Sequence, residues 1–392
     1  MVLHTVRDLF SMMCVLTMAA VTLLTALRHC VKRGSTQKKS GDNLRQLTFW
    51  EDEIHQYPTP METITKLAPT AEISDAFWKH YKKFRGINGG VGEYERIMVS
   101  ISGGSDSDVL IDMIERIGYE PGTVHYVFFN TGIEFQATKD HIKELEEKYG
   151  VEIEEVKAKM PVAVACHKFG QPFLSKQVSE WIMRLQRHGF KWEDKPLDEL
   201  LKEYPKCKAA LRWWCNDYGE DSKLNICRNK YLKEFMMNTP PNFPISNKCC
   251  QKSKKENAHN YEESFNPDLS VTGVRKSEGG ARSIAYKNCF DDVPFGCSNL
   301  RLVFWFTADD KEEYCKAFDV EHSRCYTQYG MKRGGCACCP FGRDFEQELK
   351  AAKEYEPKLY KVAMLIFGKS YEYTRKYKDF CVQMKLKEKG VA

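Results

Sequence analysis

Hydrophobic and polar positions follow two alternating periods in the first half of the chain. From about residue 70, apolar side chains recur at helical spacing, and the glycines within 86–92 are expected to end this helix. Residues 96–100 predict a strand, and residues 108–117 predict a helix that stops at Gly118. Strands at 124–129 and 151–156 enclose a helix from about 137 to 149. This alternation indicates an α/β fold with a doubly wound, mostly parallel sheet.

The pattern changes after the third predicted strand. Residues 170–245 combine tryptophans, many lysines and amphipathic runs, which predicts a helical insertion covering one edge of the sheet. Apolar stretches at 269–272 and 302–306 predict strands that return to the sheet, and the chain after Cys339 is expected to be helical. The predicted organisation is an apolar segment and basic linker at 1–48, a central domain at 70–345, and a helical region at 346–392.

The amino-terminal segment has the length of a membrane span. Residues 9–27 carry no charged side chain, and basic residues follow them at 28, 32, 33, 38 and 39. If this segment is an anchor, those charges hold the rest of the chain in the cytoplasm. A buried helix and a spurious upstream extension are the alternatives. In each case we expect the catalytic domain to be cytoplasmic.

The composition and the number of cysteines indicate the broad class of protein. With 42% hydrophobic and 29% charged residues among 392, the chain has the composition of a soluble globular enzyme. Its formal charge of +5 is too small to indicate nucleic-acid binding by itself. Sixteen cysteines in a chain of this length do not fit a small disulfide-rich secreted domain. Because several of them are clustered, we interpret them as thiol ligands in a reducing compartment.

A glycine-rich loop connects the first predicted strand to the helix that follows. It consists of Ser102, Gly103, Gly104, Ser105, Asp106 and Ser107. Its glycines allow a phosphate group to approach the backbone, and the amides at the start of the helix favour negative charge. It is neither a Walker A loop nor a G-x-G-x-x-G dinucleotide loop. The sequence therefore predicts a phosphate-binding loop of another type, whereas the alternative is a plain glycine turn.

The string Ser-Gly-Gly-x-Asp-Ser resembles the pyrophosphatase loop (PP-loop) of the N-type ATP pyrophosphatases. Within that superfamily, the stretch 129–135 is similar to the second signature of phosphoadenosine phosphosulfate (PAPS) reductases, with Asn130, Thr131 and Gly132 where those enzymes have Asp-Thr-Gly. The resemblance covers roughly residues 90–345. It implies a Rossmann-like PP-loop fold and binding of an adenylyl nucleotide: PAPS, adenylyl sulfate (APS) or ATP. Ser105 stands where many ATP-using members have lysine.

Two cysteine pairs form the second candidate site. Cys249 and Cys250 are adjacent, and Cys336 and Cys339 follow after a long gap, with Cys338 as an extra thiol. Thiolates suit iron–sulfur clusters and zinc alike. The order Cys-Cys then Cys-x-x-Cys is similar to the arrangement that holds a [4Fe–4S] cluster in assimilatory adenylyl-sulfate reductases. The resemblance therefore implies a cluster, with zinc as the alternative and Cys338 as a possible substitute for Cys339.

Three basic residues complete the predicted nucleotide site. Lys254 follows the cysteine pair where the family has a lysine near the acidic groups of the nucleotide. Arg275 and Arg282 resemble the Gly-x-Arg…Arg element of the same reductases. A guanidinium holds phosphate or sulfate oxygens in a two-point fork, which lysine cannot reproduce. The alternative for each residue is an exposed surface charge.

The leading hypothesis is a PAPS reductase-like enzyme that reduces or transfers the sulfur group of an adenylyl nucleotide, with a thiol electron donor such as thioredoxin. These reductases end in Glu-Cys-Gly-Ile/Leu-His, which this sequence lacks, since Cys381 lies in Phe-Cys-Val-Gln. No catalytic residue is therefore assigned. The second hypothesis is ATP-dependent sulfur transfer to nucleic acid, as in tRNA thiolation or DNA phosphorothioation. The third is a non-catalytic nucleotide or redox sensor. The oligomeric state is left open.

Overall fold

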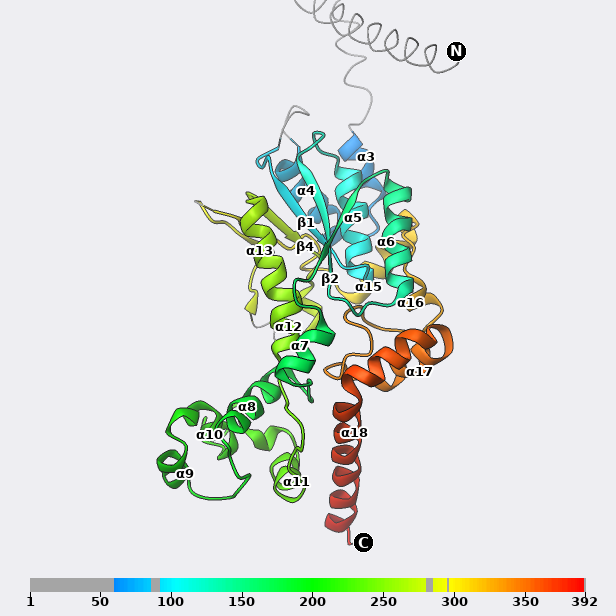
Figure 1. Cartoon of the computed structure of the whole chain (residues 1–392). Coiled ribbons are helices and arrows are strands. Elements are labelled where there is room, and N and C mark those ends of the chain that lie inside the picture. The colour runs from blue at the N-terminus through cyan, green and yellow to red at the C-terminus, as the bar shows by residue number, and fades with distance from the viewer. Residues whose placement is uncertain (1–59, 86–91, 280–284, 295, 391–392) are drawn as a thin grey trace, which may run out of the picture. The chain divides into compact units, whose positions relative to one another are not determined.

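The computed structural model describes residues 60–85, 92–279, 285–294 and 296–390, and residues from Pro60 onward form one unit (Figure 1). The apolar segment 9–27 and Arg282 lie outside the described residues. Within the described residues, none of the helices combines the length and apolar character that crossing a bilayer requires.

A six-stranded sheet carries the fold. Its strand order is β3-β2-β1-β4-β6-β5, and all neighbours are parallel except β5 and β6. The strands are β1 (Ile97–Ile101), β2 (Val124–Asn130), β3 (Ile153–Lys157), β4 (Leu269–Thr272), β5 (Phe290–Asp291) and β6 (Ser298–Leu300). The predicted α/β, mostly parallel sheet is confirmed. From β1 the chain continues to β2 on one side, whereas β4 pairs on the other, so the strand order reverses between β1 and β4.

The predicted strand at 302–306 is wrong. The strand in this region is β6, and the residues after it form successive turns in which Phe304 N donates to Arg301 O and Phe306 N to Val303 O. Leu302, Val303 and Phe304 are all buried, whereas a half-buried strand would alternate. A short apolar run shows that a segment is buried but does not show its backbone conformation.

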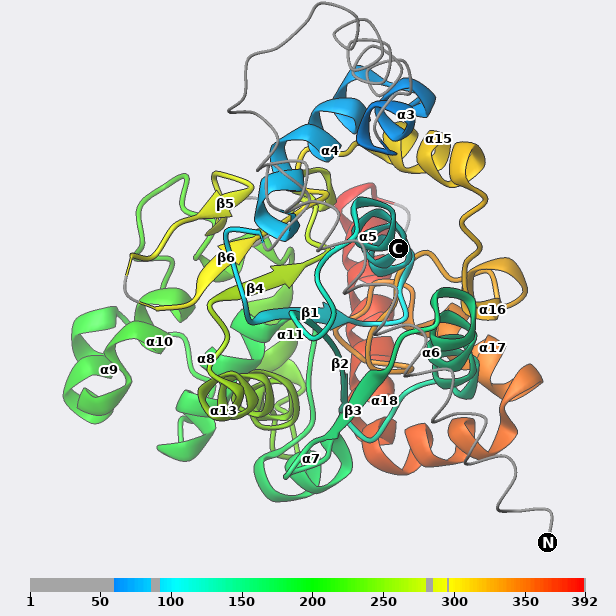
Figure 2. The same ribbon diagram turned by 90° about the horizontal axis from the view of Figure 1, so that it is seen from above.

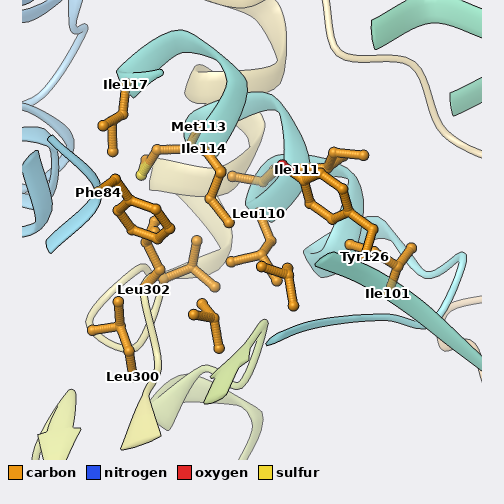
Figure 3. Packing of buried hydrophobic residues seen from close by; sticks show 14 of the residues in the cluster. Phe84, Ile101, Leu110, Ile111, Met113, Ile114, Ile117, Tyr126, Leu300 and Leu302 are labelled. Carbon is orange, nitrogen blue, oxygen red and sulfur yellow. The ribbon is translucent and has the colours of Figure 1, made fainter. Parts of the chain in front are cut away.

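Helices cover both faces of the sheet. On one face lie α4 (Ala71–Phe84), α5 (Ser105–Ile117), α6 (Gln136–Tyr149) and α15 (Ala308–Phe318), and on the other lies α13 (Glu256–Phe265) (Figure 2). Figure 3 shows that α5 places Leu110, Ile111 and Ile114 against the sheet and against Phe84 of α4. Ten of the thirteen residues of α5 are buried, so its start is held rigidly.

The insertion after β3 builds a second hydrophobic cluster of its own. Its helices are α8 (Lys176–Arg187), α9 (Leu197–Glu203), η2 (Pro205–Cys207), α10 (Lys208–Trp214), η3 (Ile226–Arg228) and α11 (Leu232–Asn238). Trp213 and Trp214 are fully buried there, and Trp214 Nε1 donates to Glu193 O at 2.9 Å. Tyr373 and Tyr377 of α18 (Pro357–Glu388) belong to the same cluster. These aromatics are therefore core residues.

A third cluster joins the cysteine-rich segments. It contains Cys249, Cys338 and residues of α7 (Val162–Phe169), α17 (Phe345–Tyr355) and α18. The remaining elements are α3 (Pro60–Leu67), α12 (Lys248–Cys250), the π-helical turn η4 (Gln251–Lys255), η5 (Lys276–Glu278) and α16 (Arg324–Thr327). The polar tail after Cys339 is helical, as predicted, and its long helix α18 contacts α7 and α11.

Candidate functional site

The glycine-rich loop lies at the carboxyl edge of the sheet, beside the end of β4. Because Ser100 of β1 pairs with Thr272 of β4, the residues after both strands come together. A Cβ atom on Gly273 would lie only 3.0 Å from Asp106 O, in the first turn of α5. In doubly wound sheets, ligands bind where the strand order reverses. The loop is at this position.

Ser107 fixes the conformation of the loop. Its Oγ accepts hydrogen bonds from Gly104 N at 3.1 Å and Ser102 N at 3.3 Å, and donates to Gly104 O at 2.7 Å. This hydroxyl therefore serves the loop itself. The amides of Ser105 and Asp106 open α5 and have no acceptor within the helix. They stand at the positive end of its dipole, which favours an anion.

At two positions of the loop, neighbouring atoms leave too little room for a side chain. Gly103 has φ +64°, and a Cβ there would lie 2.7 Å from Thr138 Cγ2. A Cβ on Gly104 would lie 3.2 Å from both Ser102 Oγ and Tyr326 Oη. The first glycine therefore permits a left-handed backbone, and the second permits close packing above the loop.

Two cations meet on the carboxylate of Asp106. Arg275 Nε donates to Asp106 Oδ1 at 2.8 Å, and Lys311 Nζ lies 3.2 Å from the same oxygen. Arg275 Nη1 also donates to Ser277 Oγ at 2.9 Å and to Thr307 O at 3.2 Å. Arg275, one of the predicted nucleotide-binding residues, therefore lies beside the glycine-rich loop.

Tyr326 lies directly against the loop. A Cβ on Gly334 would meet its hydroxyl at 3.1 Å and Gly104 Cα at 3.4 Å, so the segment before the cysteine motif covers the loop. Burial raises the pKa of Tyr326 to about 12, and hydrogen bonds from Ser105 oppose this rise. The Tyr326 hydroxyl therefore already accepts a hydrogen bond from the Ser105 amide, and an anion at this amide would compete with it.

A buried carboxylate underlies the same turn. Asp108 is 0% exposed and lies between two imidazoles, with Oδ1 2.9 Å from His141 Nε2 and Oδ2 2.8 Å from His322 Nδ1. Although burial opposes protonation, the hydrogen bond to Asp108 and the contact with Cys315 raise the pKa of His322 to about 9. The charged imidazole of His322 gives the second oxygen of this buried carboxylate a partner, beside the one that His141 gives the first.

The second signature forms a tight turn after β2. Glu134 closes it: Oε1 accepts from Thr131 N at 2.9 Å, and Oε2 accepts from Gly132 N at 3.1 Å. Asn130 Oδ1 also accepts from Gly132 N at 2.7 Å, while its Nδ2 donates to Glu155 Oε1 at 2.6 Å. An aspartate at position 130 could make the first bond but would repel Glu155. The neighbouring carboxylate thus accounts for asparagine here.

Thiols from three segments converge beside this turn. Cys336 Sγ lies 3.3 Å from Thr131 Oγ1. Burial, followed by the charges of Cys336 and Cys250, raises the pKa of Cys339. A hydrogen bond to Cys166 raises the pKa of Cys249, and a hydrogen bond to Cys249 raises that of Cys250. The described cysteines are all free thiols. The structure therefore brings the four predicted ligands together and adds Cys166 of α7.

Cys338 points into a different environment. It has φ +56°, is fully buried, and its backbone N donates to Glu348 Oε2 at 2.8 Å. Burial, followed by the charge of Glu348, raises the pKa of its thiol to about 12. The pKa of its thiol is influenced by the carboxylates of Glu348 and Glu356, whereas that of Cys339 is influenced by Cys336 and Cys250, so Cys339 lies with the other thiols.

The donor set fits a thiolate-bound group. Each of the four thiols has a raised pKa, because burial and neighbouring sulfur atoms disfavour the thiolates. A bound cationic centre removes this penalty by neutralising them. Within the described parts of the chain, no group of three His, Cys, Asp or Glu side chains has the arrangement of a single metal-ion site.

Lys254 lies beside the thiols. It is part of the turn η4, and its charge lowers the pKa of Cys250 and of Cys336 against the larger effects that raise them. Because Cys336 contacts Thr131, Lys254 also lies near the second signature. Arg275 and Lys254 thus lie at two parts of the site, the loop and the cysteines.

A pocket opens next to Cys250. It is lined by residues of α8, α12, η4 and α13, among them Lys176, Trp181, Lys255 and His259. Within the described residues, the buried Trp181 Nε1 has no hydrogen-bond partner. The pocket therefore combines an aromatic ring, basic side chains and a thiol.

Several residues of the site were missed by sequence reasoning. They are Lys311, Tyr326, His141, His322 and Cys166. The Thr-x-x-Asp capping box at Thr307 could have predicted the start of α15. No local pattern links these residues to the loop, because the contacts join distant parts of the chain.

Comparison with known proteins gives one family match. Residues 96–212 match the family model of the phosphoadenosine phosphosulfate reductase domain, which spans the loop, the second signature and part of the insertion. No curated protein sequence matches the chain.

Solved structures supply three further similarities. Phosphoadenylyl-sulfate (PAPS) reductase from Candida auris, in a phosphate complex, is 14% identical over 76% of this chain and 98% of that chain, with a TM-score of 0.33. The U34-tRNA thiolase NcsA from Methanococcus maripaludis, with its [4Fe-4S] cluster, is 14% identical over 79% of each chain, with a TM-score of 0.33. The NH3-dependent NAD synthetase from Campylobacter jejuni is 11% identical over 81% of this chain and 96% of that chain, with a TM-score of 0.29.

Proposed function

We propose that this chain binds an adenylyl nucleotide and reduces or transfers its sulfur group, because residues 96–212 match the family model of the phosphoadenosine phosphosulfate reductase domain. The observation that carries the proposal is the loop at the strand reversal. There the first amides of α5 lie at the positive end of the helix, with the Ser105 amide against the Tyr326 hydroxyl, and Arg275 and Lys311 add positive charge. Such a site takes an anionic phosphate or sulfate group.

The residues of the loop and the second signature have distinct roles in this proposal. Ser107 holds the loop in shape, and the amides of Ser105 and Asp106 donate to the phosphate oxygens. Arg275 binds the charged end of the nucleotide, and Arg282 is proposed to do the same from the segment outside the described residues. Asn130, Thr131 and Gly132 form the neighbouring wall of the site.

The thiols form the second part of the site. Cys249, Cys250, Cys336 and Cys339 would hold a [4Fe–4S] cluster, and zinc is the alternative. When bound, the cluster would tune the electrostatics of the sulfate site. Lys254 would add positive charge beside it. In the reductive reaction, the bond between the sulfate sulfur and the bridging oxygen breaks, sulfite leaves, and a dithiol such as thioredoxin is oxidised to a disulfide.

One observation favours a second function, ATP-dependent sulfur transfer to nucleic acid. The pocket beside Cys250 is lined by Trp181, Lys176 and Lys255, and within the described residues the indole nitrogen of Trp181 has no hydrogen-bond partner. Aromatic rings among basic side chains bind nucleic-acid bases and phosphates. In this reaction the loop would direct cleavage of ATP to AMP and pyrophosphate.

Product analysis tests both functions. The full chain, purified without oxygen, is incubated with PAPS or APS and reduced thioredoxin, and separately with ATP and RNA or DNA. Sulfite release supports the first function, and pyrophosphate release that depends on nucleic acid supports the second. If neither product forms although the nucleotide binds, both enzymatic functions are contradicted. A non-catalytic nucleotide or redox sensor is then the hypothesis that remains.

A loop variant tests the nucleotide site separately. Gly104→Val places a branched side chain where a Cβ is already 3.2 Å from Ser102 Oγ and Tyr326 Oη, so we expect it to abolish nucleotide binding. Calorimetric titration measures the affinity, and thermal unfolding checks that the variant is folded. Unchanged affinity in a folded variant would refute the loop assignment.

A further inference from the structure

Lys311 brings an amine to the loop from a helix that lies 206 residues further along the chain. Its Nζ donates to Ser105 Oγ at 2.8 Å and lies 3.2 Å from Asp106 Oδ1. The start of α15 is fixed by a capping box, in which Thr307 and Asp310 bind each other's backbone amides. Because Thr307 O accepts from Arg275, the two cations are held in one local framework.

Two cations share one carboxylate at this turn. The ion pairs that the structure describes there place Arg275 and Lys311 on the single carboxylate of Asp106. The side chains of Arg275 and Lys311 are 11% and 20% exposed, so water screens this charge only partly. The amides of the first turn of α5 add a partial positive charge at the same place. These positive groups therefore favour the binding of a further anion at this turn.

The chemistry of Lys311 suits a polyphosphate. An ammonium group is a compact point charge on a flexible stem, so it can follow phosphate oxygens as they enter. The guanidinium of Arg275 is more constrained, because it also donates to Ser277 and to Thr307 O. Lys311 can leave Asp106 without leaving that carboxylate unpaired, since Arg275 stays bound to it.

We propose that Lys311 is a phosphate-binding residue of the nucleotide site and that its ammonium group selects for the length of the phosphate chain. This inference rests on the proposed nucleotide binding at the loop. It predicts that each further negative charge on the chain strengthens the contribution of Lys311. Adenosine should gain nothing from this residue, AMP little, and ATP most.

Calorimetric titration of the full chain with adenosine, AMP, ADP and ATP tests the proposal. Lys311→Gln keeps a side chain that can bind Ser105 but removes the charge. We expect it to weaken ATP binding on the order of 10-fold or more, weaken AMP binding less, and leave adenosine unchanged. Lys316→Gln is the matched control, because Lys316 lies on the same helix, is 71% exposed and pairs with Glu312.

The outcomes distinguish the role of Lys311 from the proposed nucleotide binding at the loop. If wild type binds ATP and Lys311→Gln binds it equally well, the role of Lys311 is overturned and the nucleotide site stands. Equal weakening for adenosine and ATP also overturns it, because that result shows a structural effect. If wild type binds none of the four ligands, the role of Lys311 is overturned, whereas binding of PAPS or APS would still support the proposed function. Lys311→Arg keeps the charge, so retained ATP binding in this variant supports the inference even if Lys311→Gln is less stable.

Discussion

A single methyl group on Gly273 should displace the backbone of the first turn of α5, which forms part of the candidate site. The Cβ of an alanine at this position would lie 3.0 Å from Asp106 O, 3.2 Å from Asp106 C and 3.4 Å from Ser107 N. Ordinary contacts are about 3.5–4.0 Å, so strand β4 and helix α5 must separate by about half an ångström. The contacted atoms are backbone and cannot rotate away. We expect Gly273→Ala to lower the free energy of unfolding by about 1–3 kcal/mol.

The same displacement should reach the loop. Asp106 is held by Arg275 at 2.8 Å, and the amides of the first turn are the proposed phosphate donors. Hydrogen exchange measured by mass spectrometry should therefore show faster exchange in the peptides of β4 and α5. Calorimetric titration should show weaker nucleotide binding.

The control is the same substitution at a glycine with open space around it. A Cβ on Gly368 in helix α18 meets nothing within 4 Å, and alanine favours the helix by about 1 kcal/mol over glycine. Gly368→Ala should therefore raise stability where Gly273→Ala lowers it. If Gly273→Ala is as stable as wild type and exchange in β4 and α5 is unchanged, the reasoning from close backbone contact is refuted.

Two further predictions concern pH and the thiols. Because the pKa of His322 is raised from 6.5 to about 9, its pairing with Asp108 contributes stability that is fully present below about pH 6.5 and is lost as pH rises through about 9. Denaturant titrations should show the stability difference between wild type and His322→Gln shrinking across that window; a constant difference would contradict the assignment. Cys339→Ser should lower the iron or zinc content of anaerobically purified protein, whereas Cys338→Ser should not, because its thiol lies beside Glu348. Equal metal loss in both variants would contradict the prediction that Cys339, and not Cys338, is a ligand.

Local patterns in the sequence determined the framework of the fold. The predicted strands at 96–100, 124–129, 151–156 and 269–272 agree with the structure to within two residues. The sequence also predicts a glycine-rich loop after the first of these strands, and the structure has this loop between β1 and α5. These features depend on periodicity, glycines and turn residues within a few positions of one another, which a sequence displays directly.

Tertiary structure alone decided which side chains share the site. The contact between Lys311 and Ser105 joins residues 206 positions apart, and that between His322 and Asp108 joins residues 214 apart. The sequence showed serine at position 105 and gave no sign that α15 supplies an amine to it. The apolar run 302–306 predicts a strand but forms turns, since burial in turns and burial in a sheet produce the same composition. Contacts of this kind depend on the path of the whole chain, which no short window of sequence contains.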